Sequence, residues 1–156
     1  MNKKGFTLIE LLVVIAIIGL LSTLAVVALS SAREKARDSK RLSDLKQIQT
    51  ALELYYTDKG AYPTTAAGVA SISLGVLNTT DCLDATTGFT SKATCTTPYM
   101  GLVPADPQDA NADYVYISPS TGNGLTYTIN ASLEGTVGNL IKTIQASPSG
   151  IQDVTP

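Results

Sequence analysis

The feature that most limits how this chain can fold is an apolar run near its N-terminus. No charged residue occurs in residues 11–32, and the most apolar part, residues 11–29, has about the 20 residues that a helix needs to cross a bilayer. Gly19, Ser22 and Thr23 interrupt the run with small or hydroxylated side chains, which permit close approach between helices. We therefore expect one membrane-spanning helix that can also pack against other helices.

This run continues into an amphipathic segment without a helix-breaking residue. Neither Pro nor Gly occurs between Leu20 and Lys59, and Gly60 then supplies a stop, with Pro63 just beyond it. The pattern predicts one helix over residues 6–59, about 80 Å long at 1.5 Å per residue. Residues 6–32 are apolar on all sides, whereas residues 33–60 have one apolar face. That face comprises Ala36, Leu42, Leu45, Ile48, Leu52 and Tyr55.

The segment after the helix, residues 61–112, is rich in Thr, Ala, Ser and Gly and has weak periodicity. We interpret it as an irregular connector with room for one short helix. Cys82 and Cys95 lie in it without a Cys-x-x-Cys spacing, so a single disulfide is the simplest interpretation. That disulfide would close a loop of about 14 residues and add about 3 kcal/mol of stability in the chain-entropy model.

Three candidate strands follow, at residues 114–117, 125–129 and 138–144. Turn-forming residues over 118–124 separate the first two, which predicts a hairpin or meander. A small antiparallel sheet over residues 113–146 must bury one face, and the apolar face of the helix is the available cover. The expected fold class is α+β, with the long N-terminal helix packed on this sheet, and residues 147–156 are expected to form a flexible tail.

Composition excludes several classes of function. The net charge is −2 with no basic block in the C-terminal part, so nucleic acid is not expected as a primary partner. The chain has no histidine, which removes Ser-His-Asp triads, Cys-His pairs and HExxH zinc sites. No nucleophile–base pairing or phosphate loop supports catalysis, so we do not expect an enzyme. Tyr55, Tyr56 and Tyr62 are interpreted as packing residues where the helix meets the sheet.

The first ten residues read Met-Asn-Lys-Lys-Gly-Phe-Thr-Leu-Ile-Glu and precede the apolar run directly. This segment resembles the N-terminal signal of type IV prepilins and type II secretion pseudopilins. The resemblance implies that a prepilin peptidase removes the leader, residues 1–5, between Gly5 and Phe6 and methylates the new amine of Phe6. It also implies a pilin-like fold and a structural role as a filament subunit. Tyr62 and Pro63, and Leu-Val-Pro-Ala-Asp-Pro at 102–107, are similar to further pseudopilin stretches.

Glu10 is the acidic group at the edge of the apolar run, where a charge still requires a partner. In the family that partner is the N-terminal amine of a neighbouring subunit, which here is the amine of Phe6. Phe6 and Glu10 are four residues apart and share a helix face, so a neighbour displaced by about one turn brings its amine beside this carboxylate. The alternative is a Glu10 that reaches lipid headgroups or pairs with its own amine.

The resemblance implies partners and a location. The partners are membrane lipid, the prepilin peptidase, an inner-membrane assembly platform, and copies of this chain with other pilins or pseudopilins. We expect a single pass through the cytoplasmic membrane with the N-terminus inside, followed by an extracytoplasmic pilus or pseudopilus. The count of positive residues favours the opposite orientation, since two precede the span and five follow it. Large C-terminal domains translocate largely regardless of charge, and the family's peptidase acts on the cytoplasmic side.

Metal binding is the point at which the chain departs from the family. Major pseudopilins resemble one another in an acidic C-terminal calcium loop, but the matching stretch, residues 130–135, has Glu134 as its single acid. Calcium takes six to eight oxygen ligands, so we expect no metal cofactor; the remaining candidates are Asp106, Asp109 and Asp113.

Two other classes of protein remain open. One is a secreted protein whose signal peptide is cut near residues 30–32, although its apolar region is longer than the usual 7–15 residues. The other is a single-span membrane-anchored enzyme or sensor.

Overall fold

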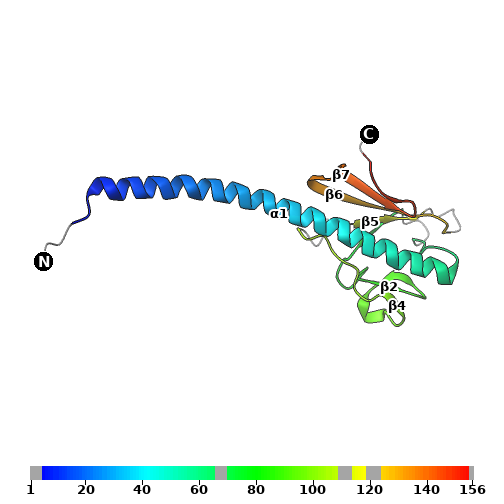
Figure 1. Ribbon diagram of the computed structural model, residues 1–156. Helices are drawn as coiled ribbons and strands as arrows, with labels where there is room; N and C mark the ends of the chain where they lie inside the picture. Colours follow the sequence, from blue (N-terminus) through cyan, green and yellow to red (C-terminus); the bar gives the residue numbers. More distant parts are fainter. Residues whose placement is uncertain (1–4, 66–69, 109–113, 119–123, 155–156) are drawn as a thin grey trace. The chain divides into compact units, whose positions relative to one another are not determined.

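The computed structural model describes residues 5–65, 70–108, 114–118 and 124–154. Contacts divide the chain into two units, Met1–Glu34 and Lys35–Pro156, and each is described by itself. We call the second unit the head. One helix, α1 (Leu8–Lys59), begins in the first unit and ends in the second (Figure 1). The predicted continuous helix is confirmed, with a start two residues later than expected.

The end of α1 is set by Gly60. Its backbone has φ of 72°, a left-handed conformation that costs glycine little, and its N–H donates to Tyr56 O at 2.8 Å. The chain then turns back, and Tyr62 N donates to Gly124 O at 2.6 Å. The predicted helix stop at Gly60 is therefore confirmed.

A five-stranded antiparallel sheet packs against α1 in the head. The hairpin predicted from the first two candidate strands is confirmed, because β5 and β6 are antiparallel neighbours. Residues 119–123 of the turn between them lie outside the described residues. In spatial order the strands are β1 (Ile72–Leu74), β5 (Tyr114–Ile117), β6 (Thr128–Val137), β7 (Leu140–Ser147) and β8 (Gly150–Asp153).

The expectation of an irregular connector over residues 61–112 is wrong. Besides β1, this segment forms a second antiparallel sheet in the order β3 (Gly88–Thr90), β2 (Cys82–Asp84), β4 (Pro98–Met100), and a 3-10 turn η1 (Lys92–Thr94). Strands of three residues are too short to show alternation in sequence, so the pattern could not reveal them. The predicted Cys82–Cys95 disulfide is present and links β2 to the end of η1.

Two other boundaries also differ from expectation. The second candidate strand begins only at Thr128 but continues to Val137, so the stretch compared with the calcium loop is strand. The expected tail over residues 147–156 is wrong, because β8 pairs with β7 through Ser147–Gly150 and Ile144–Asp153. A turn of Pro148 and Ser149 joins them, and such local signals are easily read as a frayed end.

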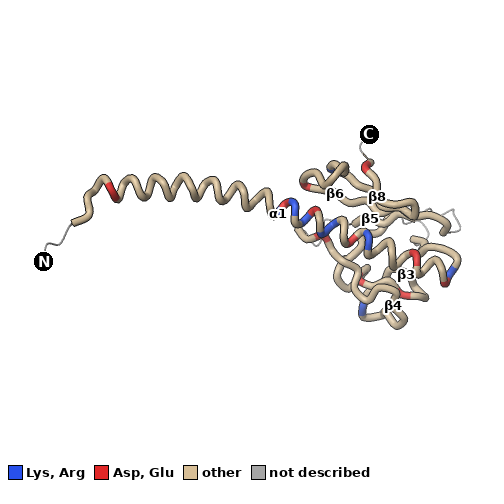
Figure 2. The backbone as a smooth tube through the Cα atoms, viewed as in Figure 1, with Lys and Arg blue, Asp and Glu red and all other residues tan. Residues whose placement is uncertain are grey.

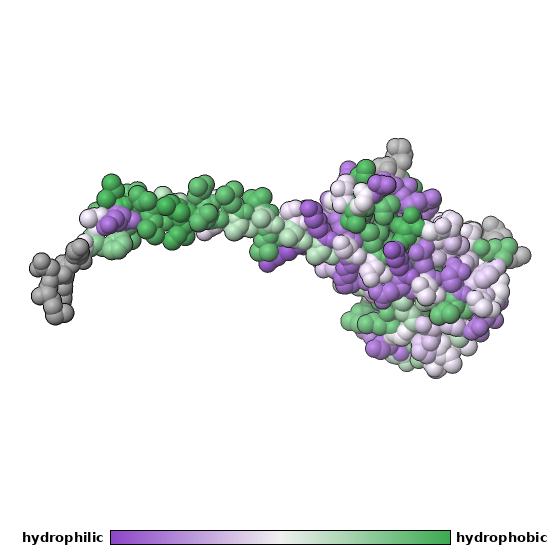
Figure 3. Space-filling model, in the orientation of Figure 1, coloured by the Kyte–Doolittle hydropathy of each residue, from purple (hydrophilic) through white to green (hydrophobic). Residues whose placement is uncertain are grey.

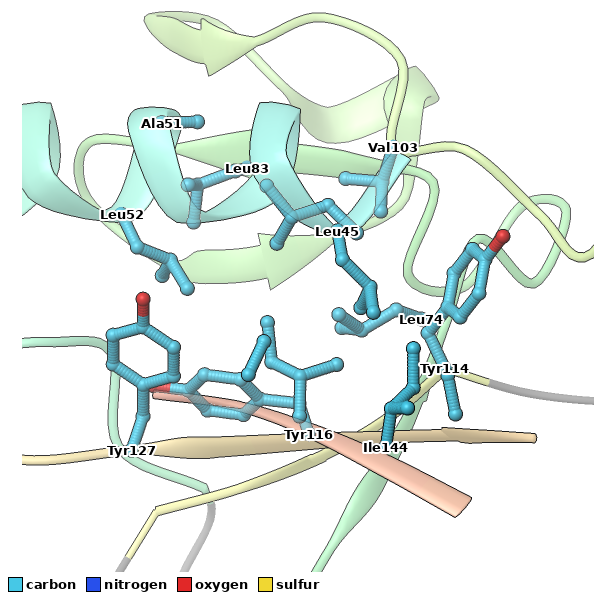
Figure 4. Packing of buried hydrophobic residues seen from close by; sticks show 14 of the residues in the cluster. Leu45, Ala51, Leu52, Leu74, Leu83, Val103, Tyr114, Tyr116, Tyr127 and Ile144 are labelled. Carbon is cyan, nitrogen blue, oxygen red and sulfur yellow. The ribbon is translucent and has the colours of Figure 1, made fainter. Parts of the chain in front are cut away.

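The core lies between α1 and the two sheets, as Figure 4 shows. Leu45, Ile48 and Leu52 of α1 are fully buried, and Leu42 and Tyr55 pack at the margin, which confirms this part of the predicted apolar face. Ala36, which was predicted to belong to that face, is exposed. Each such leucine or isoleucine contributes about 1.5–3 kcal/mol by leaving water. The partners are Leu74, Leu83, Val103, Tyr114, Tyr116, Tyr127, Ile129 and Ile144.

Tyrosine rings close the core where α1 ends. Tyr62 stacks on Tyr56 with ring centroids 4.7 Å apart and meets Tyr127 edge-on at 4.7 Å. Tyr127 in turn stacks on Tyr116 at 5.8 Å. Tyr55 meets Tyr99 at 5.4 Å. These contacts confirm the interpretation of Tyr55, Tyr56 and Tyr62 as packing residues.

Candidate functional site

The first candidate site is the start of α1, where Thr7 and Glu10 cap the helix. Thr7 Oγ1 accepts from Glu10 N at 3.3 Å, and the Glu10 carboxylate accepts from Thr7 N at 2.8 Å and Thr7 Oγ1 at 2.7 Å. This is the reciprocal capping box that a Thr followed three residues later by Glu favours. In the single chain, Glu10 therefore orients its carboxylate toward its own N-terminus.

Phe6 and Glu10 lie on the same side of this helix start. Together with Ile9, Val13 and Val14 they line a shallow open depression of about 360 Å³. Its walls are apolar apart from the Glu10 carboxylate, and the Phe6 side chain is 78% exposed. The structure thus brings Phe6 and Glu10, the two predicted assembly residues, together on one exposed and mostly apolar surface. Gly5 directly precedes Phe6, outside the helix.

Beyond this start, the first unit presents a continuous apolar surface (Figure 3). One described helix, α1, is long and apolar enough to cross a membrane. Figure 2 shows acidic colour near the start of the helix and then none of either sign until the basic and acidic residues further along. The exposed large side chains are Leu8, Ile9, Leu11, Leu12, Val13, Val14, Ile15, Ile17, Ile18, Leu20, Leu21, Leu24, Val26, Val27 and Leu29.

A second polar site lies in the head around the buried guanidinium of Arg41. Its Nε and Nη2 donate to the two carboxylate oxygens of Asp106 at 2.6 and 2.9 Å. Its Nη1 donates to Asp38 Oδ1 at 2.7 Å and Glu134 Oε1 at 2.8 Å. Arg37 also pairs with Glu134, through Nε to Oε1 at 2.6 Å. We call Arg37, Asp38, Arg41, Asp106 and Glu134 the Arg41 cluster.

The Arg41 cluster ties α1 to β6 and to the 102–108 segment. Asp38 accepts from the backbone N–H groups of Glu134 at 3.0 Å and Gly135 at 2.9 Å, where the pairing of β6 with β7 shifts register. Hydrogen bonds to a charged carboxylate are stronger than those between neutral groups. This cluster therefore fixes how β6 lies on the helix within the head.

The sequence held a signal for this cluster that the prediction missed. Asp38 and Arg41 continue the buried stripe of Leu45, Ile48 and Leu52 at steps of three and four. Charged residues on the core face of a helix are rarely buried unless they are paired. Their position on that stripe indicates a buried ion cluster, but the predicted face included apolar residues alone.

Of the three candidate metal ligands, Asp106 lies within the described residues. Both oxygens of Asp106 accept from Arg41, and no group of three or more acidic or cysteine side chains suited to a metal ion is found among the described residues. Asp109 and Asp113 lie outside the described residues. The Arg41 guanidinium binds both carboxylate oxygens of Asp106, so a metal cation would have to compete with it for that carboxylate. Asp106 by itself, with both oxygens bonded to Arg41, does not supply the six to eight oxygen ligands that calcium takes.

The Arg41 cluster predicts acid-sensitive stability. Hydrogen bonds from Arg37 and then Arg41 lower the pKa of Glu134 from its ordinary value of 4.5 to about 2. The ionised form is therefore favoured by folding, so its contribution is complete above about pH 4.5 and is lost as pH falls toward 2. Urea unfolding in detergent, followed by tyrosine near-ultraviolet circular dichroism, should show stability falling over that range. The free energy of unfolding should depend less on pH for Glu134→Gln than for the unaltered chain. An equal dependence on pH in the two chains would contradict the assignment to Glu134.

Comparisons with known proteins agree with this architecture. A family described as "Prokaryotic N-terminal methylation motif" matches residues 1–26, and one described as "Type II secretion system (T2SS), protein G" matches residues 28–138. Type II secretion system core protein G of Escherichia coli K12 is 32% identical over 137 residues, which cover 88% of this chain and 86% of that protein.

Other relatives match over a shorter part. Type II secretion system core protein G of Klebsiella pneumoniae is 43% identical and that of Aeromonas hydrophila 41% identical, each over 71 residues. These matches cover 46% of this chain and 51% and 50% of the two relatives, so here the chain spans about half of their length. No solved structure matches the chain.

The long N-terminal helix with its exposed apolar first part, the methylation motif and the antiparallel head define a protein of the pilin and pseudopilin class. This confirms the class that the first ten residues predicted. More specifically, the chain belongs to the type II secretion system protein G family, whose model covers most of its length.

Proposed function

We propose that this chain is a pseudopilin, a structural subunit that is anchored in the cytoplasmic membrane and then polymerises into a type II secretion pseudopilus. The observation that carries the proposal is the exposed apolar surface of residues 11–32, which contains no charge and begins next to the carboxylate of Glu10. Such a surface requires lipid or other apolar helices around it. In a membrane anchor that later becomes the core of a polymer, this surface is covered first by lipid and then by the helices of other subunits.

Assembly requires contacts that repeat without closing. Head-to-tail contacts of this kind build an open helical filament. In our proposal the depression formed by Phe6, Ile9, Glu10, Val13 and Val14 receives the start of a neighbouring helix. The amine that peptidase cleavage creates on the neighbour's Phe6 then pairs with Glu10. This pairing would draw the carboxylate away from Thr7, to which it is bonded in the single chain.

The N-terminus is proposed to face the cytoplasm, so that the leader meets the prepilin peptidase and the head is exported. Three of the five basic residues that follow the span pair with carboxylates of the head: Arg37 and Arg41 pair with Glu134, and Lys40 pairs with Asp44. The remaining partners would be other pseudopilins and an inner-membrane assembly platform.

Analysis of the mature N-terminus tests this proposal. In cells with an active prepilin peptidase, mass spectrometry should find a chain that begins with N-methylated Phe6, and proteinase K should digest the head in spheroplasts. Gly5→Leu should abolish cleavage, because it places a bulky side chain at the scissile bond, whereas the distant Gly101→Leu at an exposed head position should be processed normally. An intact Met1, or a start near Arg33, would instead support the anchored or secreted alternatives. A protected head would overturn the orientation.

A further inference from the structure

The residues around the disulfide form a symmetrical arrangement of carboxylates that the proposed function does not use. Cys82 is fully buried in β2, and the two aspartates nearest to it, Asp81 and Asp84, are 3% and 1% exposed. Among the described residues, no Lys or Arg side chain forms an ion pair with either aspartate; each instead binds backbone N–H groups of the segment that carries Cys95. Burying a carboxylate costs free energy unless several donors satisfy it. We therefore asked what these two buried aspartates contribute to the segment that they bind.

Asp81 holds the chain before Cys95. Its Oδ1 accepts from Lys92 N at 2.7 Å and its Oδ2 from Asn78 N at 3.1 Å. Lys92 opens η1, and Cys95, which ends this turn, donates its own N–H to Lys92 O at 3.4 Å. Asp81 therefore fixes the start of the turn whose other end is the cysteine.

Asp84 holds the chain after Cys95. Its Oδ2 accepts from Thr96 N at 2.9 Å and from Thr97 N at 2.7 Å. Its Oδ1 accepts from Thr86 N at 2.8 Å and Thr86 Oγ1 at 2.5 Å. Hydrogen bonds from the Thr86 hydroxyl and the Thr97 backbone keep the pKa of Asp84 well below its usual range. The carboxylate is thus charged and fully occupied at neutral pH.

We propose that Asp81 and Asp84 are positioning residues for disulfide formation: they bring Cys95 beside Cys82 before any S–S bond exists. The two carboxylates bracket Cys82 in sequence, and their hydrogen bonds bracket Cys95. Joining two thiols across a flexible loop has an entropic cost that rises with loop length. Here that cost is met by hydrogen bonds to charged groups, which are stronger than neutral ones. The inference is independent of the filament proposal.

The chemistry needs an external disulfide as oxidant. One cysteine thiolate attacks a sulfur of oxidised glutathione and releases one glutathione thiolate, leaving a mixed disulfide. The second cysteine thiolate attacks the protein sulfur of that mixed disulfide and releases the second glutathione thiolate. The two protons lost by the cysteines go to the two glutathione molecules, and two electrons pass to the oxidant. Preorganisation acts on the second attack, because that step requires Cys82 and Cys95 to meet.

Equilibration with glutathione measures this effect. The full-length chain in detergent is incubated with mixtures of reduced and oxidised glutathione, quenched with a maleimide, and scored for the oxidised fraction. Asp84→Asn places an amide donor against the N–H donors of Thr86, Thr96 and Thr97. The effective concentration of the cysteine pair should fall at least tenfold, which corresponds to about 1.4 kcal/mol. Asp153→Asn, which removes a carboxylate that accepts from Ile141 N in the other sheet, is the matched control and should leave it unchanged.

A second measurement does not depend on the folding of the Asp84 variant. In the full-length Cys82→Ala, Cys95→Ala chain, amide hydrogen exchange at Lys92, Thr96 and Thr97 should remain at least tenfold slower than exchange of an unstructured loop. Exchange at unstructured rates in that chain would show that the disulfide alone holds the segment, and would overturn the proposal. Equal effective concentrations for Asp84→Asn and Asp153→Asn would overturn it as well.

Discussion

Arg41→Ala is expected to lower the free energy of unfolding by about 3–5 kcal/mol, the range for removal of one partner from a buried ion pair. Arg41 is 4% exposed at its side chain, and its removal leaves Asp38 and both oxygens of Asp106 without the cation that they share. Glu134 would retain its ion pair with Arg37. Urea unfolding of the full-length chain in detergent, followed by tyrosine near-ultraviolet circular dichroism, measures the loss.

Lys46→Ala is the matched control for this prediction. Lys46 lies on the exposed side of the same helix, where substitutions usually change stability by less than about 0.5 kcal/mol. If Arg41→Ala proves as mild as Lys46→Ala, the cluster is not what holds β6 on the helix. If Arg41→Ala unfolds normally but its leader is no longer removed normally, Arg41 would act outside the head instead.

Glu10→Ala should reduce the yield of assembled filament at least tenfold while leaving the amount of membrane-inserted, processed subunit nearly unchanged. Our reason is that the carboxylate lies at the start of an apolar surface, where it can attract the amine of an incoming neighbour. Quantitative immunoblotting of the sheared filament fraction measures the filament yield, and immunoblotting of the membrane fraction measures the amount of processed subunit.

The capping contact offers a sharp control for Glu10. Glutamine also serves in a capping box, so Glu10→Gln retains an acceptor for Thr7 N but loses the charge. If the charge guides assembly, Glu10→Gln should fail nearly as completely as Glu10→Ala. Normal filament yield from Glu10→Gln would mean that the residue acts as a helix cap alone.

The first unit and the rest of α1 could largely be predicted, because the sequence patterns that indicate them extend over many residues. The apolar run is uninterrupted, and the buried stripe repeats over Leu45, Ile48 and Leu52, so both signals extend over several helical turns. Gly60 marks the end of the helix by its left-handed conformation. The pairing of β5 with β6 was predictable from alternation and turn residues for the same reason. Family membership followed from the specific order of residues at the N-terminus.

The connector and the Arg41 cluster were not predictable in this way. Strands β2, β3 and β4 depend on side chains such as Asp84, which bind backbone groups 12 and 13 residues away in the chain. The cluster joins Arg41 to Asp106 and Glu134, which are 65 and 93 residues away. Contacts of this kind are decided by tertiary packing and leave no period in the sequence. The expectation of an irregular connector was a natural consequence.

The order of strands along the chain has a consequence for biogenesis. Helix α1 comes first, yet most of what covers its stripe belongs to β5, β6 and β7, which are made much later. A chain delivered from its N-terminus must pass through an interval in which that stripe faces water, and uncovered apolar surface favours wrong association. Two short connections shorten the interval: residues 138–139 join β6 to β7, and residues 148–149 join β7 to β8. Local hairpins of this kind close within microseconds, so the last part of the chain to arrive can shield the first without delay.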